Sequence, residues 1–539
     1  MVIELQNKNN NLAAAAAIVM SSVIVSRITG FIREMLIPAK FGVEKISDAY
    51  YIAFQIPDLM FTLLVGGSIS AALVPVLSGY IEKNEEEEGW KAASNFINFV
   101  TVCMIIGSIL GIIFAPNLLS ILSPSYSQNR PEMVPVTVNM MRVLFPSVTF
   151  IMLAGMCTGI LNSYKRFASS AYGPSVYNVL CALSILLLSN SNKDDYYGVY
   201  KVAYGIMASA LLYFLFQLSF TLKYIHNYRL TLDIKEEGFK KLFRLAVPSL
   251  ISSSIMQINI IISVGFTSLM PAGQVTALRM ADRTWQMPLG VIAQAVGVAI
   301  LPTLAGMLAT GQLLEYKSTL MKSLKSVLVL SMPCSISFIV LSNLIVRTLF
   351  QFSGKVDNES VALTASILSI FSIALITQSI STILNRGFYA ANDTKTPLFI
   401  GASTILANIA LSYLFFKTTS LGARGMAVSY AIASIINAFL LIIVLDKKMQ
   451  GLDLKKFLIF FVKLMACCAV MAFALLLSKV IFPPTFAGSG YDFKTKILQL
   501  AVLGMQNTIG FAAFAGCALF LKVEEAQIMI RKLAFFRKN

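Results

Sequence analysis

The chain contains a long series of apolar stretches with few charged residues, and most of them are about 20 residues or longer. A helix of about 20 residues spans a hydrocarbon core of about 30 Å, so each stretch is long enough to cross a bilayer. Composition agrees, because 57% of the 539 residues are hydrophobic and only 13% are charged, against about 25% charged residues in soluble globular proteins. We therefore predict an all-α polytopic membrane protein.

These stretches predict about fourteen transmembrane helices. The first continues past Ser26 without a small-residue cleavage site, so we expect a retained helix rather than a signal peptide. Several stretches exceed about 25 residues, so tilts or breaks are expected, with kinks at Pro57, Pro75, Pro146 and Pro302. The predicted spans are 12–37, 47–80, 91–114, 134–161, 167–189, 198–222, 242–269, 274–308, 324–350, 360–390, 397–416, 421–445, 457–481 and 497–521.

The net charge of +17 is explained by the loops between the spans. With the N-terminus inside, we count about 25 Lys and Arg in cytoplasmic loops against about 12 outside, the asymmetry expected of membrane proteins. Both termini are then cytoplasmic. No basic stripe with interleaved aromatic residues lies outside the apolar stretches, so no nucleic-acid partner is expected.

The sequence also contains an internal repeat. AALVPVLSG at 71–79 resembles VAILPTLAG at 298–306, and Leu-Asn at 161–162 matches Leu-Asn at 384–385, with nearly equal offsets. The offset carries six helices onto the next six, so the two halves have the same orientation in the membrane. We predict a lobe of helices 1–6 at 1–230, a lobe of helices 7–12 at 231–450, and helices 13 and 14 with a cytoplasmic tail at 451–539.

Ionisable residues inside the predicted spans are the candidate functional residues, because an arginine near a helix centre costs about 2.5–3.5 kcal/mol when it faces lipid. Four arginines would together cost on the order of 10 kcal/mol, comparable with the net stability of a domain. They must therefore face the protein interior or a watery cavity. The candidates are Arg27, Arg33, Glu34, Asp48, Asp58, Arg279, Asp282 and Arg283.

Two interpretations of these charges remain open. Internal ion pairs, such as Arg283 with Asp48 or Asp58, would join the two lobes. Alternatively, Arg27, Arg33, Arg279 and Arg283 line a cavity that binds an anion, because guanidinium groups bind phosphate in bidentate fashion. The two interpretations are compatible if Glu34, Asp48, Asp58 and Asp282 act as gating or ion-pair partners that open for substrate.

Other function classes find less support in the sequence. No nucleotide-binding G-x-x-x-x-G-K-[ST] motif occurs, so transport would use an ion gradient, the membrane potential or substrate consumption on the far side. The seven cysteines lie in apolar stretches without a C-x-x-C pair, and His226 is the single histidine, so no metal or cofactor is expected. No cluster of acids or histidines suggests an enzyme, and a purely structural scaffold would not need four buried arginines.

Motifs spread along most of the chain resemble the MurJ/MviN family of peptidoglycan lipid II flippases. They are SRITGFIRE at 26–34, DAY at 48–50 with Pro57, VP at 74–75, LN at 161–162 with RF at 166–167, ADR at 281–283, LP at 301–302, GFYA at 387–390 and DTKTP at 393–397.

This resemblance implies the fold of the multidrug/oligosaccharidyl-lipid/polysaccharide exporter superfamily in a bacterial cytoplasmic membrane. It also implies that the residues matching Arg27, Arg33, Arg283 and Asp48 line a central cavity. The substrate would be an undecaprenyl-diphosphate disaccharide-pentapeptide, flipped from the inner to the outer leaflet, with its lipid tail running towards helices 13 and 14.

One part of the family pattern is absent. Many members carry a basic pair early in helix 2 and a glutamate one turn later, where this chain has Phe61-Thr62 and Gly66-Gly67. A sibling exporter that moves another polyprenyl-diphosphate glycan therefore remains the main alternative. A drug exporter would favour acidic cavity residues, and an unrelated two-lobe solute carrier usually has twelve helices, so both fit less well.

Overall fold

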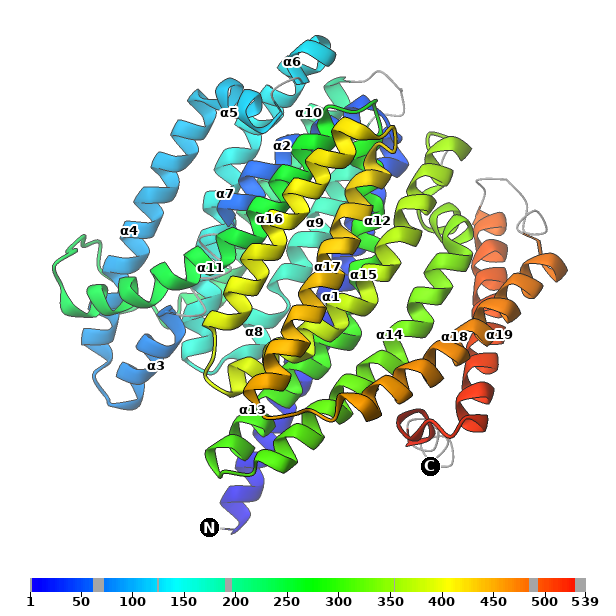
Figure 1. Cartoon of the computed structure of the whole chain (residues 1–539). Coiled ribbons are helices and arrows are strands. Elements are labelled where there is room, and N and C mark those ends of the chain that lie inside the picture. The colour runs from blue at the N-terminus through cyan, green and yellow to red at the C-terminus, as the bar shows by residue number, and fades with distance from the viewer. Residues whose placement is uncertain are drawn as a thin grey trace. The chain divides into compact units, whose positions relative to one another are not determined.

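The computed structural model describes residues 2–61, 72–123, 126–189, 196–352, 354–483 and 493–528. Within these ranges the regular structure is helical, with no strand (Figure 1). The prediction of an all-α protein is therefore confirmed. The chain divides into two compact units, residues 1–276 and 277–539, each described by itself below.

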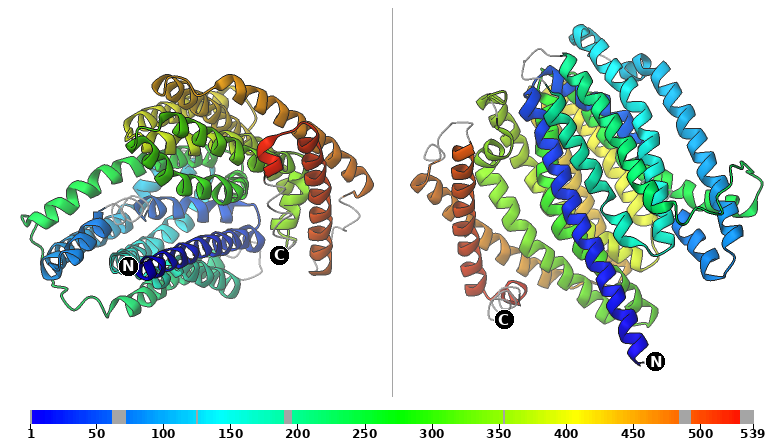
Figure 2. Two further views of the ribbon diagram at one scale, coloured as in Figure 1. Left: turned by 90° about the horizontal axis from the view of Figure 1, so that it is seen from below. Right: turned by 180° about the vertical axis from the view of Figure 1, so that it is seen from behind.

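The first unit is organised around one long central helix, α7. Helices α2, α4 and α10 all pack against α7, and α9 packs against both α1 and α10. Figure 2 shows α1 as a single long helix that begins at the N-terminus. The elements are α1 (Val2–Phe41), α2 (Lys45–Phe61), α3 (Val74–Glu82), α4 (Glu86–Ile113), α5 (Ala115–Leu122), α6 (Tyr126–Asn129), the 3₁₀-helix η2 (Pro131–Met133), α7 (Val134–Ser163), α8 (Phe167–Ala171), α9 (Gly173–Leu188), α10 (Tyr196–Thr221) and α11 (Glu237–Ser268).

The second unit is organised around α15, which packs against α13, α14 and α17. Helices α18 and α19 form a hairpin that packs against α14. The elements are α12 (Gln274–Leu289), whose first turn belongs to the first unit, the π-helix η3 (Gly290–Gln294), α13 (Ala295–Ala309), α14 (Leu313–Phe350), α15 (Asn358–Ala390), α16 (Lys395–Thr418), α17 (Ala423–Lys448), α18 (Leu454–Ile481) and α19 (Phe493–Phe520).

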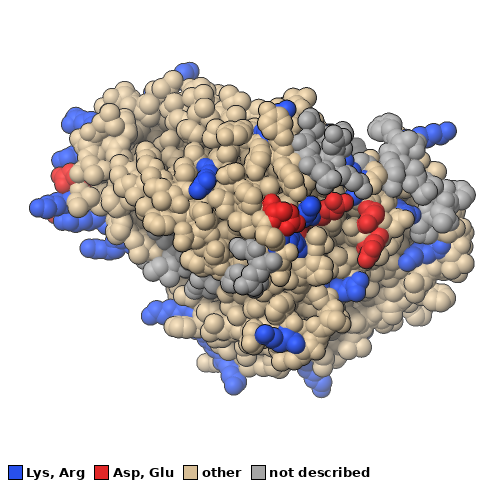
Figure 3. Space-filling view, turned by 90° about the horizontal axis from the view of Figure 1, so that it is seen from above, with Lys and Arg blue, Asp and Glu red and all other residues tan. Residues whose placement is uncertain are grey.

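Ten helices among the described residues are long and apolar enough to cross a membrane. Large apolar side chains on these helices are exposed, for example Phe473 at 70% and Val480 at 78% on α18, which a water-soluble surface would not tolerate over so many positions. Most of the surface visible in Figure 3 is neither acidic nor basic. The chain is thus a multi-pass membrane protein, while the count of about fourteen spans and the lobe bounds 1–230, 231–450 and 451–539 stay predictions.

The prolines singled out in the sequence occupy two kinds of position in the helices. Pro57, Pro146 and Pro302 lie inside α2, α7 and α13, whereas Pro75 lies in the first turn of α3, where its missing N–H costs nothing. The positions at which the sequence departs from the family pattern, Thr62, Gly66 and Gly67, lie outside the described residues, and α2 ends at Phe61.

Candidate functional site

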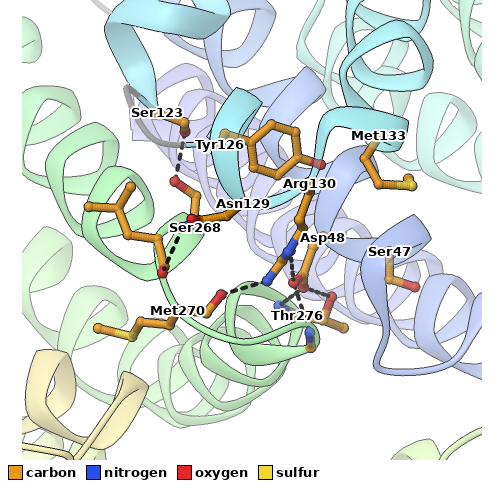
Figure 4. A network of polar contacts seen from close by, with 12 residues as sticks. Ser47, Asp48, Ser123, Tyr126, Asn129, Arg130, Met133, Ser268, Met270 and Thr276 are labelled. Carbon is orange, nitrogen blue, oxygen red and sulfur yellow. Dashed lines mark hydrogen bonds and ion pairs between the residues drawn. The ribbon is translucent and has the colours of Figure 1, made fainter.

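Asp48 lies in the first turn of α2, and its side chain is completely buried. Its Oδ1 accepts hydrogen bonds from the main-chain N–H of Thr276 at 2.8 Å and from the Thr276 hydroxyl at 2.6 Å. Its Oδ2 accepts from the main-chain N–H of Gly273 at 2.8 Å and from Nη1 of Arg130 at 3.1 Å. Figure 4 shows these donors converging on the carboxylate. Four donors, one of them charged, offset the cost of burying a carboxylate.

The carboxylate of Asp48 also caps the N-terminus of α12, because Gly273 and Thr276 flank the first turn of that helix. A negative charge at this end interacts favourably with the helix dipole. The turn before α12 requires glycine at position 273, where φ is +86° and an added Cβ would lie 2.3 Å from the carbonyl oxygen of Val43. The chain path thus places two main-chain donors against Asp48.

Arg130 is held in place by three groups. It pairs with Asp48, its Nη2 donates to the carbonyl oxygen of Met270 at 2.6 Å, and its guanidinium lies 5.8 Å from the ring centre of Tyr126. Arg130 follows α6 and is itself 6% exposed. It therefore links the short α6 segment to α2 and to the turn between α11 and α12.

A second contact joins the same two segments. The hydroxyl of Ser268, at the end of α11, donates to the hydroxyl of Ser123 at 2.8 Å, and both side chains are buried. The amide of Asn129 donates to the carbonyl oxygen of Leu269 at 3.4 Å. Ser123 and Asn129 are thus each bonded to the end of α11 or the turn that follows it (Figure 4).

Asp48 was identified from the sequence as a candidate ion-pair residue, and one open interpretation paired Arg283 with Asp48 or Asp58. In the structure, the cation beside Asp48 is Arg130, which is not among the candidates from the sequence. Arg130 lies between two predicted spans, where it counts as an ordinary loop charge. The one hint was a polar loop that contains Arg130 and precedes a proline, and that pattern is too common to identify a buried arginine.

Arg33 and Glu34, on α1, form a partly buried ion pair, with Nη2 of Arg33 at 2.8 Å from Oε1 of Glu34. The guanidinium of Arg33 also lies 5.9 Å from the ring centre of Tyr177 on α9. A cation over an aromatic face gains electrostatic stabilisation without a counter-ion. The side chain of Arg33 remains 20% exposed, so the ion pair is not sealed off.

Arg27 lies one turn before Gly30 on α1 and is partly exposed. The amide of Asn178 donates to the carbonyl oxygen of Ser26 at 3.2 Å and occupies the space beside Gly30, where a Cβ would lie 3.1 Å from its nitrogen. The small residues next to Arg27 therefore allow close approach of α9. On α2, Asp58 is partly exposed, and no described residue forms a hydrogen bond or ion pair with it.

Arg279, Asp282 and Arg283 share one side of α12, since they are three and four residues apart. Arg279 is 9% exposed, and its Nε has no hydrogen-bond partner among the described residues. The Oδ1 of Asp282 instead accepts from the indole N–H of Trp285 at 3.1 Å. The acid on this helix thus orients a tryptophan, and among the described residues Arg279 has no ion pair.

Trp285 anchors α12 within the second unit. Its ring centre lies 6.0 Å from that of Phe371 on α15 and 5.9 Å from that of Tyr430 on α17, and it is 2% exposed. Three packed aromatic rings fix the rotation of α12 about its axis. They therefore also fix the direction in which Arg279 and Arg283 project.

The arginines among these groups share one binding chemistry. Guanidinium groups remain protonated and hold phosphate oxygens through several N–H donors. The candidate residues suit recognition of an anion.

Comparison with known proteins gives one consistent picture. The family model described as "Lipid II flippase MurJ" matches residues 37–491. The probable lipid II flippase MurJ of Buchnera aphidicola subsp. Acyrthosiphon pisum is 29% identical over 433 residues, covering 80% of this chain and 83% of that protein. The lipid II flippase MurJ of Burkholderia cenocepacia is 29% identical over 469 residues, covering 86% and 89%.

Solved structures support the same fold. A lipid II flippase MurJ in an inward closed conformation aligns with a TM-score of 0.74 at 24% identity, covering 94% of this chain and 98% of that one. An inward-facing multidrug transporter of the MATE family in the MOP superfamily aligns with a TM-score of 0.66 at 15% identity, covering 81% and 99%. Since the family model matches most of its length, this chain belongs to the lipid II flippase MurJ family.

Proposed function

We propose that this chain flips lipid II, the undecaprenyl-diphosphate-linked peptidoglycan precursor, from the inner to the outer leaflet of a bacterial cytoplasmic membrane. Support comes from membership of the MurJ family and from relatives named lipid II flippases that align along most of their length. It is a transporter and not an enzyme, with no cofactor. Its partners are the lipid-linked glycan, the surrounding lipid and a coupling ion or the membrane potential.

The observation that carries the proposal is the state of Arg279. A guanidinium inside an apolar helix is costly unless it is paired, yet Arg279 is buried, its Nε lacks a hydrogen-bond partner among the described residues, and Asp282 is engaged by Trp285. An incoming diphosphate would supply the missing acceptors. Arg27, Arg33, Arg279 and Arg283 are therefore proposed to form a cationic substrate cavity.

We assign a gating role to the network around Asp48. In the predicted topology, with both termini cytoplasmic, the start of α2, the segment of Arg130 and the turn before α12 all lie on the external side. The bonds from Asp48 to Gly273 and Thr276, together with the bond from Arg130 to Met270, would then close the external end between the predicted lobes. Alternating access requires that this network open when substrate is released. Glu34, Asp58 and Asp282 are assigned supporting ion-pair roles around the cavity.

Complementation of a bacterium whose own lipid II flippase can be shut off tests the proposal. We expect rescue of growth together with recovery of external access of an impermeant probe to lipid II. Arg27→Ala, Arg279→Ala and Arg283→Ala should insert normally but fail to rescue. The matched control is Arg424→Ala, which removes an exposed guanidinium in the first turn of α17.

Two results would overturn the proposal at different levels. Full rescue by all three cavity variants would reject the cationic cavity while leaving the flippase function intact. Failure of the well-inserted parent chain would instead favour a sibling exporter of another polyprenyl-diphosphate glycan. The Phe61-Thr62 and Gly66-Gly67 positions would then be the first to exchange for the family residues.

A further inference from the structure

The segment between α10 and α11 is bound along its length to α4. Buried polar side chains on α4 provide the attachment points, with Ser94, Asn95 and Asn98 exposed by 0%, 1% and 9%. We call residues 228–236 of this segment the strap. In Figure 1 the strap belongs to the green loop that leads into α11, beside α4.

The attachment uses the main chain of alternate strap residues. The side-chain amide of Asn98 donates to the carbonyl oxygens of Arg229 at 2.9 Å and Thr231 at 2.8 Å. The main-chain N–H of Asp233 donates to the side-chain oxygen of Asn95 at 3.0 Å. Because residues 229, 231 and 233 are the ones bonded to α4, the strap is attached to α4 at every second residue.

The residues between these attachment points form an exposed apolar edge. Leu230, Leu232 and Ile234 are exposed by 90%, 55% and 53%. Three large apolar side chains at alternate positions of a connecting segment are costly in water, at about 25 cal/mol per Å² of apolar surface. Their regular spacing on the side away from α4 indicates a surface that has a partner.

The depth of the strap along α4 indicates what that partner is. Lys91 is the last charged residue of α4, and the remainder of the helix to Ile113 is uncharged. The strap is attached within two turns after Lys91, at about 1.5 Å of rise per residue. It therefore lies at the level where α4 enters the apolar phase.

Basic residues stand beside the apolar edge. Lys240, Lys241 and Arg244 are exposed on the first turns of α11, while Phe239 and Leu242 on the same turns are buried in the cluster that includes α4. Among the described residues no carboxylate pairs with these three cations. Two of the adjacent acids have other partners, since Asp233 accepts from the N–H of Lys235 and Glu236 caps α11 through the N–H groups of Gly238 and Phe239. The third, Glu237, is exposed in the first turn of α11, so the net charge of Glu237, Lys240, Lys241 and Arg244 remains positive.

From this arrangement we infer that the strap is a lipid-interface anchor: Leu230, Leu232 and Ile234 insert into the acyl boundary of the adjacent leaflet, and Lys240, Lys241 and Arg244 bind the phosphates of anionic lipid headgroups. An apolar edge flanked by Lys and Arg is the composition of segments that lie in the membrane interface. The anchor is independent of which substrate the protein moves. It would fasten the connection between the two repeats to the membrane.

Insertion of the strap can be measured by tryptophan fluorescence. The two native tryptophans, Trp90 and Trp285, are exposed by only 0% and 2%, so quenchers in lipid or water should act mainly on an added surface indole. Leu232→Trp therefore adds one exposed indole to the full-length protein. We would reconstitute it in vesicles of phosphatidylcholine and phosphatidylglycerol and subtract the parent signal. The added fluorescence should be quenched by lipids brominated near the headgroup end of the acyl chain and protected from aqueous iodide.

Lys83→Trp is the matched control, since Lys83 lies exposed in the turn before α4, on the water side of the glutamates that begin that helix. Its indole should be quenched by iodide and not by brominated lipid. Equal iodide quenching of the two variants would overturn the anchor and leave the edge as a docking surface for a soluble protein.

The headgroup contribution is tested with the triple variant Lys240→Gln, Lys241→Gln, Arg244→Gln in the Leu232→Trp background. With the three cations present, replacing phosphatidylcholine by phosphatidylglycerol should increase insertion of the indole, and the triple variant should remove this dependence. Insertion that is equal in the two lipids, with or without the cations, would overturn the phosphate part of the inference.

Discussion

Arg130 and Asp48 are 82 residues apart in the chain, yet they form an ion pair of 3.1 Å in which the Asp48 side chain is fully buried and that of Arg130 is 8% exposed. Neither group could be buried alone at acceptable cost. The pair therefore holds the segment before α7 and the start of α2 in a fixed relative position.

The effects of removing the two partners should not add. Arg130→Met leaves a buried carboxylate without its counter-ion and should lower the free energy of unfolding by about 3–5 kcal/mol. The double variant Arg130→Met, Asp48→Leu should lose less than the sum of the single variants. Thermal unfolding in detergent measures each.

The matched control is Arg229→Met, which breaks an exposed ion pair with Glu87, whose side chains are 57% and 73% exposed. Such pairs contribute about 0–1 kcal/mol. Equal losses for Arg130→Met and Arg229→Met would contradict the special cost of the buried pair.

Thr276 contributes one side-chain and one main-chain donor to Asp48, and only the side-chain donor can be removed by substitution. Thr276→Val keeps the shape and the N–H but loses the hydroxyl at 2.6 Å, so we expect a loss of about 1.5–3 kcal/mol, the range for hydrogen bonds to charged groups. Thr276→Ser should stay close to the parent. If valine and serine gave the same unfolding temperature, the hydroxyl would have no role in holding Asp48.

Gly111 allows α4 to approach α7 closely. An added Cβ would lie 2.4 Å from the ring of Phe145, which is completely buried, so Gly111→Ala should cost about 1–3 kcal/mol through overpacking. Gly401, inside α16, has nothing within 4 Å of the same position, and Gly401→Ala should gain up to about 1 kcal/mol from helix propensity. Opposite shifts of the two unfolding temperatures are the expected result, and shifts of the same sign would refute the packing argument.

Asp393 precedes α16 and forms an ion pair of 2.6 Å with Lys448. Burial alone would raise the pKa of Asp393, but hydrogen bonds from Lys448 and from Thr396 outweigh it and lower the pKa to about 2. Because this value is below about 3.9, the usual pKa of an unfolded Asp, the stabilisation is complete above that pH and lost as the pH falls through about 2.

The stability of the parent should therefore fall more steeply than that of Asp393→Asn between about pH 4 and pH 2. Unfolding temperatures of both proteins across this range provide the measurement. Parallel curves would show that Asp393 is not held ionised by its neighbours.

The helices were predictable because their apolar stretches are long. Most described residues of each predicted span are helical, from α1 to α19. Within the predicted span 47–80 the structure describes α2 as far as Phe61 and α3 from Val74, and residues 62–71 lie outside the described residues.

The candidate site was only partly predictable, for a physical reason. Cost of burial identifies Arg279 and Asp48 as residues that need an interior environment, but it does not identify which donor meets which acceptor. The bonds of Asp48 to Arg130 and to the N–H groups of Gly273 and Thr276 depend on tertiary contacts between distant segments. Main-chain donors carry no signature in the sequence beyond the glycine that permits the turn.

Two of the four donors to Asp48 belong to the backbone, and this has a consequence for how the contact can change over evolutionary time. Substitution at Arg130 or of the Thr276 hydroxyl can weaken the contact by degrees, whereas the N–H groups of Gly273 and Thr276 persist through nearly every exchange of side chain. The strength of the contact is therefore open to gradual adjustment, while its location is inherited with the path of the chain.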